Sequence, residues 1–150
     1  MTTPTILADT AGTAKVDRSG AVRSVKAVAT LAASTAADTI VGMIRFQKGF
    51  SLDHFAVVSD DLDTATNSTL DVGYVYDDDT TYTDDPDAFF DGIDIVQAAS
   101  TSDVWPVADG NLVGVGFEAE ADGYIVVQIK GAATDTEGDI TMKALFSYDG

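Results

Sequence analysis

Short segments in which apolar and polar residues alternate recur along this chain. The clearest is TLDVGYVY at residues 69–76, where large apolar side chains occupy every second position. A period of two places such residues on one face of a β-strand. We therefore predict a strand over 69–76, with Leu70, Val72, Tyr74 and Tyr76 facing inward and Thr69, Asp71, Gly73 and Val75 facing outward.

Further strands are predicted over residues 21–30, 39–47, 50–58, 112–119, 124–130 and 140–148. A Lys48-Gly49 turn joins the second and third of these, so we expect them to pair antiparallel. Residues 31–37 are rich in alanine and fit either one helical turn or a loop. No long amphipathic helix is evident. Seven strands, or eight if residues 93–96 also pair, favour an all-β fold, an antiparallel β-sandwich of the jelly-roll type.

The first 20 residues have a different character from the rest of the chain. They contain a proline and two glycines among many threonines and alanines, and Ile6 and Leu7 form their one large apolar pair. Such a composition is typical of an extended arm. We predict an N-terminal arm over residues 1–20 and a β-sandwich domain over residues 21–150, which is long enough to bury a core without disulfides.

Charge is distributed unevenly along the sequence. The whole chain has a formal net charge of −17, but residues 1–50 hold six of the eight basic residues against three acidic ones. This acidity argues against nucleic acid as a partner, because nucleic-acid binding depends on cationic contacts to phosphate. A basic N-terminal part on an otherwise acidic protein is typical of a segment that docks on an acidic surface. The alternative is that the acidic residues form a plain solubilising surface. The N-terminus lacks a basic and apolar leader, and no apolar run is long enough for a membrane span, so we predict neither a signal peptide nor a membrane partner.

The sequence carries none of the patterns that mark common catalytic sites. It has no cysteine, and its one histidine, His54, lies on a predicted strand without a G-x-S-x-G elbow or another nucleophile signature. A phosphate-binding loop and a dinucleotide fingerprint are also absent from the sequence. We predict that the protein is not an enzyme and binds no organic cofactor.

Calcium is the one cofactor for which the sequence supplies ligands. The candidates are Asp77, Asp79, Asp84 and Asp87, whose carboxylates are the hard oxygen donors that calcium prefers. Their spacing fits no EF-hand loop. The alternative, which we favour, is a solvated acidic loop whose charges repel one another.

Two aromatic positions bear on packing. Phe89 and Phe90 stand together in the acidic segment, and they are predicted either to close the core or to cover a neighbouring subunit. Trp105, the one tryptophan, is predicted to cap the core.

Four stretches of the sequence resemble small structural proteins from the virions of tailed bacteriophages, in particular capsid decoration (cement) proteins. They make up about a third of the chain. The stretches are Ile44 to Gly49 with RFQKG, Thr69 to Tyr76 with TLDVGY, Asp85 to Asp94 with DPDAFFDGID, and Ala121 to Tyr148 with ADGYIVVQIKGAATDTEGDITMKALFSY.

The resemblance implies a jelly-roll-like sandwich that sits on the outside of the capsid and clamps neighbouring major capsid proteins. It also implies a homo-oligomer, often a trimer, made in the host cytoplasm and located in the virion. On this basis we expect the arm and the residues after it to contact the shell while the acidic body faces solvent. The expected interface residues are Ile6, Leu7, Lys15, Arg18, Arg23 and Lys26, together with Phe89 and Phe90.

A second interpretation comes from a different class of protein. In it the chain is a calcium-dependent, carbohydrate-binding β-sandwich, such as a head-fibre or tail module. The acidic segment would hold the ion, and Tyr74, Tyr76, Tyr82 or Trp105 would stack on the sugar.

Overall fold

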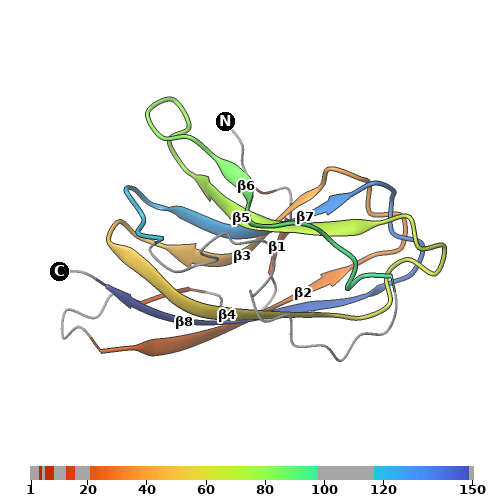
Figure 1. The fold of residues 1–150 in the computed structure, drawn as a ribbon, viewed down its shortest axis with the longest axis horizontal. Helices are drawn as coiled ribbons and strands as arrows, with labels where there is room; N and C mark the ends of the chain where they lie inside the picture. Colours follow the sequence, from red (N-terminus) through yellow and green to blue (C-terminus); the bar gives the residue numbers. More distant parts are fainter. Residues whose placement is uncertain (1–3, 5, 9–12, 16–20, 98–116, 149–150) are drawn as a thin grey trace.

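The protein is described from a computed structural model, which describes residues 4, 6–8, 13–15, 21–97 and 117–148. These residues form two β-sheets that face one another (Figure 1). The strands are β1 (Ile6–Leu7), β2 (Arg23–Leu31), β3 (Ile40–Phe46), β4 (Phe50–Ser59), β5 (Thr69–Tyr76), β6 (Asp85–Ile93), β7 (Gly123–Lys130) and β8 (Gly138–Tyr148). The part of the chain described contains no helix that is long and apolar enough to cross a membrane.

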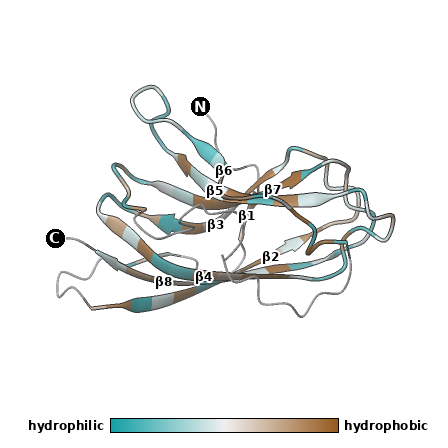
Figure 2. Ribbon diagram, viewed as in Figure 1, coloured by the Kyte–Doolittle hydropathy of each residue, from teal (hydrophilic) through white to brown (hydrophobic). Residues whose placement is uncertain are grey.

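One sheet has five strands in the order β1-β3-β7-β5-β6, and the other has three in the order β2-β8-β4. Neighbouring strands are antiparallel except β1 and β3, which run parallel. Hydrophobic stretches recur along the strands of both sheets and are separated by polar ones (Figure 2). The predicted all-β sandwich is therefore confirmed.

The predicted pairing of residues 39–47 with residues 50–58 is wrong. These segments are β3 and β4, and they lie in different sheets: β3 pairs with β7, whereas β4 pairs with β8. The turn between them contains Gly49 at φ 87°, a left-handed conformation that glycine adopts without steric penalty. Because Phe46 and Phe50 on either side of this turn are both fully buried, the chain crosses the core here and does not fold back as a hairpin.

Aromatic rings join the two sheets next to this crossing. Phe50 on β4 stacks on Phe46 of β3 with ring centroids 5.3 Å apart, and it stacks on Phe146 of β8 at 5.4 Å. Phe117 and Tyr148 meet the same ring edge-on. Offset and edge-to-face contacts of this kind add to the stability that hydrophobic burial provides.

The predicted alternation of β5 holds on its inner face. Leu70, Val72 and Tyr76 are buried in the core, and Tyr74 packs against it while remaining half-buried. The outer face, expected to be exposed, is covered as well. Asp71 and Val75 are buried there, because the backbone at the start of β6 crosses Gly73 so closely that a side chain at this position would meet the carbonyl oxygen of Asp85.

The segment after the acidic turn is the strand β6. It pairs with β5 through two irregularities of register, which leaves Phe89 and Phe90 in the core against Phe55. Residues 93–96, considered as a further strand, begin at the last residue of β6 and continue into a turn. The alanine-rich residues 31–37 are the end of β2 followed by a turn, with no helix. Trp105 and residues 112–116 of a predicted strand lie outside the described residues.

The described residues of the predicted arm are extended and run along β3. Ile6 and Leu7 form β1, and the amide of Ala14 donates to the carbonyl of Arg45 at 2.8 Å. Ala14 is itself buried, and its carbonyl accepts the Tyr148 hydroxyl at 2.9 Å. This part of the arm is therefore joined to the sandwich and closes one side of it.

A buried carboxylate organises the loop between β4 and β5. Asp63 accepts hydrogen bonds from the backbone amides of Ala65 at 3.0 Å, Asn67 at 2.7 Å and Ser68. Burial raises the pKa of Asp63, but the hydrogen bonds from Ser68, Asn67 and Ala65 outweigh burial, so the pKa lies below its ordinary value. The charged form of Asp63 therefore stabilises this loop.

We expect Phe50→Ala to lower the free energy of unfolding by about 3–5 kcal/mol, because it leaves a cavity where the two sheets meet. Denaturant unfolding followed by circular dichroism measures this. As a control, Leu145→Ala on the outer face of β8, where the side chain is 38% exposed, should cost about 0.5 kcal/mol or less. Equal losses in the two variants would contradict the role given to the aromatic stack.

We expect Asp63→Asn to lower the urea midpoint at neutral pH and to reduce its fall in acid. A carboxylate whose folded pKa is depressed stabilises the fold above its unfolded pKa of about 3.9, and this contribution is lost as pH falls through the folded value. Urea titrations from pH 7 to pH 2.5 measure the effect. As a control, the exposed Asp53→Asn should change the free energy of unfolding at pH 7 by about 0.5 kcal/mol or less.

Candidate functional site

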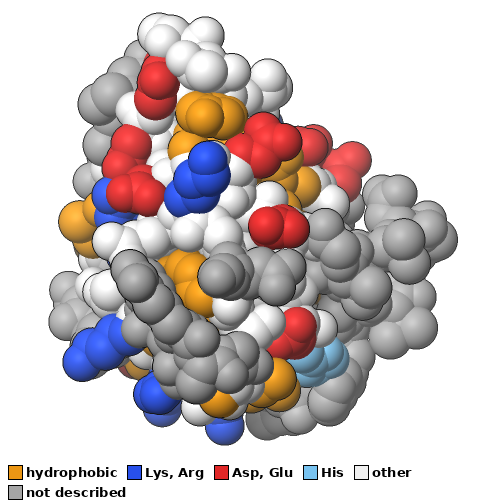
Figure 3. All heavy atoms as spheres, turned by 90° about the vertical axis from the view of Figure 1, so that its left-hand side faces the viewer, with side chains coloured by type: hydrophobic (Ala, Val, Ile, Leu, Met, Phe, Trp, Pro, Cys, Tyr) orange, Lys and Arg blue, Asp and Glu red, His pale blue; other side chains and the backbone are white. Residues whose placement is uncertain are grey.

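Acidic side chains gather around β5 and β6, whereas the strands of the three-stranded sheet carry more basic than acidic residues. Residues 70–97, which include β5 and β6 of the five-stranded sheet, contain nine aspartates and no lysine, arginine or histidine. Arg23 and Lys26 lie on β2 and Lys143 lies on β8, all in the three-stranded sheet, which also carries Asp53 on β4 and Asp139 on β8. The five-stranded sheet has two basic residues on its strands, Arg45 and Lys130. Figure 3 shows one side of the molecule with most acidic side chains on its upper part, where basic side chains lie among them, and further lysines and arginines along its lower edge. The charge is therefore unevenly distributed, with the largest excess of acidic residues around β5 and β6.

Two lysines stand directly opposite one another on the outer face of the three-stranded sheet. Lys26 of β2 is the partner of Lys143 of β8, and the next position in this row is Ala56 of β4. The neighbouring rows contain apolar side chains, including Val28 and Leu145, of which Leu145 is 38% exposed. We call the surface around Lys26 and Lys143 the basic face; two exposed carboxylates, Asp139 of β8 and Asp53 of β4, lie elsewhere on the same strands.

Like charges placed opposite one another across two strands destabilise a sheet. This chain has 25 acidic residues, yet the row that contains Lys26 and Lys143 has no carboxylate beside either lysine. The arrangement does not favour the free protein. It suits contact with an anionic surface, which would neutralise both charges.

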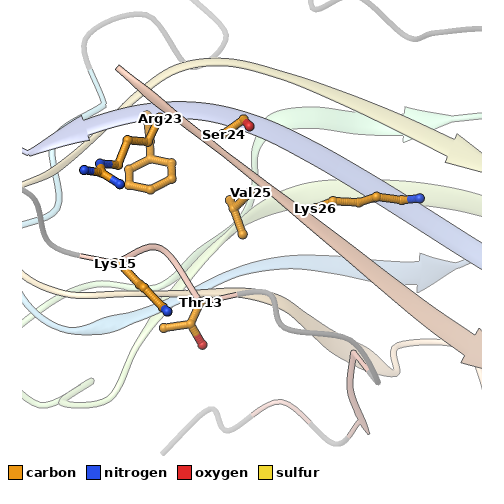
Figure 4. A pocket seen from close by; sticks show the side chains of 7 residues that line it. Thr13, Lys15, Arg23, Ser24, Val25 and Lys26 are labelled. Carbon is orange, nitrogen blue, oxygen red and sulfur yellow. The ribbon is translucent and has the colours of Figure 1, made fainter. Parts of the chain in front are cut away.

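A groove of about 470 Å³ adjoins this face. We call it the basic groove; its lining residues are Thr13, Lys15, Arg23, Ser24, Val25, Lys26 and Phe146. Figure 4 shows Thr13 and Lys15 on the N-terminal segment and the other labelled residues along β2. Arg23 has the same parity as the buried Val25 and lies opposite Phe146, so it faces the space between the sheets, whereas Lys26 belongs to the outer face.

The structure brings together three of the predicted interface residues, Lys15, Arg23 and Lys26, in the basic groove. Ile6 and Leu7 lie on the edge of the other sheet, where Leu7 is 54% exposed. Phe89 and Phe90 are 6% and 5% exposed and belong to the core of the chain itself, so we leave them out of the interface. Arg18 lies outside the described residues.

Sequence reasoning missed Lys143. It lies in the acidic part of the sequence, far from the basic start, and only the pairing of β2 with β8 places it beside Lys26. Its position between the inward residues Met142 and Ala144 was the one signal that it would face outward.

The predicted calcium ligands are not assembled into one site. Asp77 forms a two-pronged ion pair with Arg45, at 2.7 and 2.6 Å, and the Arg45 guanidinium lies over the ring of Tyr124. Asp84 accepts the backbone amide of Tyr76 at 2.8 Å. Within the described ranges, no group of three or more histidine, aspartate and glutamate side chains is placed to hold a metal ion. Asp79 and Asp87 are among the residues to which this applies.

Two neighbouring aspartates nevertheless influence each other in the acidic segment. Burial raises the pKa of Asp85, and a hydrogen bond with Asp87 raises it further. A carboxylate that takes up a proton more readily lowers the negative charge of this segment in mild acid. The effect reflects crowding of like charges on β6 and requires no ligand.

Three of the aromatic residues considered for sugar stacking do come together. Tyr74, Tyr76 and Tyr82 line a hollow of about 330 Å³ with Glu118 and Glu120. Their rings are engaged with each other, however: the centroids of Tyr74 and Tyr76 are 5.3 Å apart, and those of Tyr76 and Tyr82 are 5.4 Å apart. The tyrosines therefore extend the aromatic core to the surface at this end of β5.

Comparison with known proteins shows similarity in structure only. No protein-family model matches the sequence, and no curated protein matches it either. A chain in the capsid of Ralstonia phage GP4 is similar in structure with a TM-score of 0.70 at 20% identity, covering 97% of this chain and 98% of that chain. A chain in the capsid asymmetric unit of cyanophage Pam1 gives a TM-score of 0.69 at 16% identity, covering 91% of each chain.

These similarities confirm, at the level of the fold, the resemblance to phage virion proteins stated from the sequence. Coverage is nearly complete in both directions, so each of the two capsid chains is about as long as this one. The match is therefore to small separate chains and not to one domain of a larger protein.

We expect Lys143→Glu to stabilise the free protein by about 0.2–1 kcal/mol, because an opposite-charge pair with Lys26 replaces a like-charge pair. Thermal unfolding at low salt measures this, and the gain should shrink in 1 M salt as screening increases. Lys143→Gln, which removes one charge of the pair without creating an opposite-charge pair, should gain less. A melting temperature for Lys143→Glu at or below that of the unmodified protein would show that the lysines do not repel each other.

Proposed function

We propose that this protein is a structural component of a phage virion that binds the outside of the capsid and stabilises contacts between neighbouring major capsid proteins. One observation carries the proposal: Lys15, Arg23 and Lys26 line one groove and Lys143 lies opposite Lys26, on a chain that is strongly acidic as a whole. Such a body has one surface suited to an acidic shell and another that remains solvated.

The fold supports this assignment. Two chains of similar length and the same fold occur in capsid structures of the phages GP4 and Pam1. Among the described residues no cluster of side chains is placed to hold a metal ion, and the sequence contains no nucleophile motif. A structural role needs neither of these features. We assign no catalytic activity to the protein.

The uneven distribution of charge on the protein would orient it when it binds the capsid. At physiological ionic strength charges are screened beyond about 8 Å, so only groups that meet at close range contribute strongly. Lys15, Arg23 and Lys26 line one groove, and Lys143 lies opposite Lys26, so these four residues are close enough to act on the same acidic partner. The aspartates of β5 and β6 would be repelled by the same partner, which orients the protein with the five-stranded sheet outward.

We further propose that the protein acts as a homo-oligomer, with a trimer as the expected form. The basic groove and the basic face of one copy are small, so a single copy would bind the capsid weakly. Linking several copies makes later contacts effectively intramolecular and raises the overall affinity without any new contact. An oligomer placed between neighbouring capsid subunits would also bridge them, which is the stabilising effect proposed.

The calcium-dependent, carbohydrate-binding alternative has less support. Its tyrosines line one hollow, but they pack on each other, and the candidate carboxylates within the described residues do not gather around one position.

The test is sedimentation of the purified protein with capsids that lack it. We expect saturable binding that weakens with increasing salt, and capsids that resist heating better when the protein is bound. The variant Lys15→Glu/Arg23→Glu/Lys26→Glu should lose about tenfold or more in affinity, because three cationic contacts become repulsive.

The matched control is Lys48→Glu, which changes the charge in the β3–β4 turn, outside the basic groove and the basic face. It should bind like the unmodified protein. Circular dichroism must show that both variants are folded. Absence of saturable binding by the unmodified protein would overturn the proposed function, and equal binding by the triple variant would remove the basic groove from it.

A further inference from the structure

The hollow at the end of β5 combines aromatic rings with carboxylates. It holds about 330 Å³, and besides two threonines its lining residues are Tyr74, Tyr76, Tyr82, Phe117, Glu118 and Glu120. None of its lining residues is basic; Lys48 lines an adjoining hollow of about 590 Å³. We call the first of these the tyrosine hollow. Neither its aromatic residues nor its two glutamates have a role in the basic groove or the basic face.

The aromatic rings of the tyrosine hollow form a continuous row. Phe117 contacts Tyr74 with ring centroids 4.6 Å apart, and Tyr74 contacts Tyr76 at 5.3 Å. Tyr76 in turn contacts Tyr82 at 5.4 Å. The row continues into the core, because Tyr76 and Phe117 also meet the ring of Phe46 edge-on. Since this packing already fixes the rings, a group that enters the hollow does not have to order them first.

The tyrosine hollow lies in a negative electrostatic potential. Burial raises the pKa of Tyr74, and nearby negative charges raise it further. These include the carboxylates of Asp85, Glu120 and Asp84. Asp84 directly follows Thr83 of the lining, and its Oδ2 atom is buried without a hydrogen-bond partner among the described residues. A potential that opposes a negative phenolate attracts a positive group.

The chemistry of the tyrosine hollow therefore selects a cation. A lysine ammonium or an arginine guanidinium is attracted to the face of an aromatic ring within about 6 Å of the ring centroid. The same cation can donate hydrogen bonds to Glu118 and Glu120, and such charge-assisted bonds are the stronger kind. The methylene groups of either side chain pack on the rings while the charged end reaches the carboxylates.

The tyrosine hollow and the basic groove lie at the same end of the sandwich. Phe146 lines the groove and Phe117 lines the hollow. Phe50 contacts both rings, with centroid distances of 5.4 Å to Phe146 and 6.5 Å to Phe117. Figure 3 views the molecule from the side on which β8 ends, and both acidic and basic side chains lie there. A partner that meets the basic groove is therefore within reach of the hollow.

We propose that the tyrosine hollow receives a lysine or arginine side chain of the capsid protein whose acidic surface meets the basic groove. This inference rests on the proposed function and adds to it a second contact of opposite charge. A partner that presents acid at one point and a cation at another fits in one orientation, because the reversed orientation sets like charges against each other.

The sign of a charge effect in capsid sedimentation tests the inference. Because the shell is acidic under the proposed function, removing negative charge from this protein should in general leave its affinity unchanged or raise it. Glu118→Gln/Glu120→Gln keeps the size of both side chains, and we expect it to lower the affinity about tenfold, because a cation in the hollow loses its carboxylates.

The matched control is Asp94→Asn/Glu137→Gln. It removes the same charge from two exposed residues at the other end of the sandwich, one after β6 and one before β8. It should bind at least as well as the unmodified protein. Circular dichroism checks that both double variants are folded.

Two substitutions of Tyr82 test the aromatic contact. Tyr82→Phe keeps the ring and should bind capsids like the unmodified protein. Tyr82→Leu keeps an apolar side chain without a ring, and we expect it to bind about threefold more weakly. Equal binding by these two variants would remove the ring of Tyr82 from the cation site.

Binding by Glu118→Gln/Glu120→Gln that equals or exceeds that of its matched control overturns the inference. The unmodified protein would then still decorate capsids, so the proposed function stands and only the cation contact falls. If the unmodified protein shows no saturable binding, the proposed function falls, and the inference that rests on it falls as well.

Discussion

The packing of Phe46, Phe50 and Phe146 is the contact on which the rest of the structure depends. The three rings come from β3, β4 and β8, and with centroid distances of 5.3 and 5.4 Å they bind one sheet to the other. Because Phe46 and Phe50 lie only four positions apart, burying both forces the intervening turn to cross the core. That crossing places β3 and β4 in different sheets, and β4 is then free to pair with β8. The edge position of β2 follows from the same arrangement.

This packing also allows the charges to separate. The rings and aliphatic side chains fill the space between the sheets, so almost all charged groups are left to the outer faces and the loops. The nine aspartates of residues 70–97 repel one another there, and part of that repulsion is relieved by Arg45, which binds Asp77. The lysines of the opposite sheet have no such relief across the row that joins Lys26 to Lys143. A free protein gains nothing from this pair, which is why its position is informative about a partner.

Local patterning was enough to locate most strands but not to assign their partners. The alternation in residues 69–76 and 140–148 reports which side chains face the core, and the structure agrees for Leu70, Val72 and Met142. It cannot report whether a second layer covers the outer face, so the burial of Asp71 and Val75 was not foreseen. The pairing of β3 with β7 and of β2 with β8 joins residues about 80 to 120 positions apart, and no local signal specifies it. For the same reason the groove could be anticipated through Lys15, Arg23 and Lys26, whereas Lys143 could not.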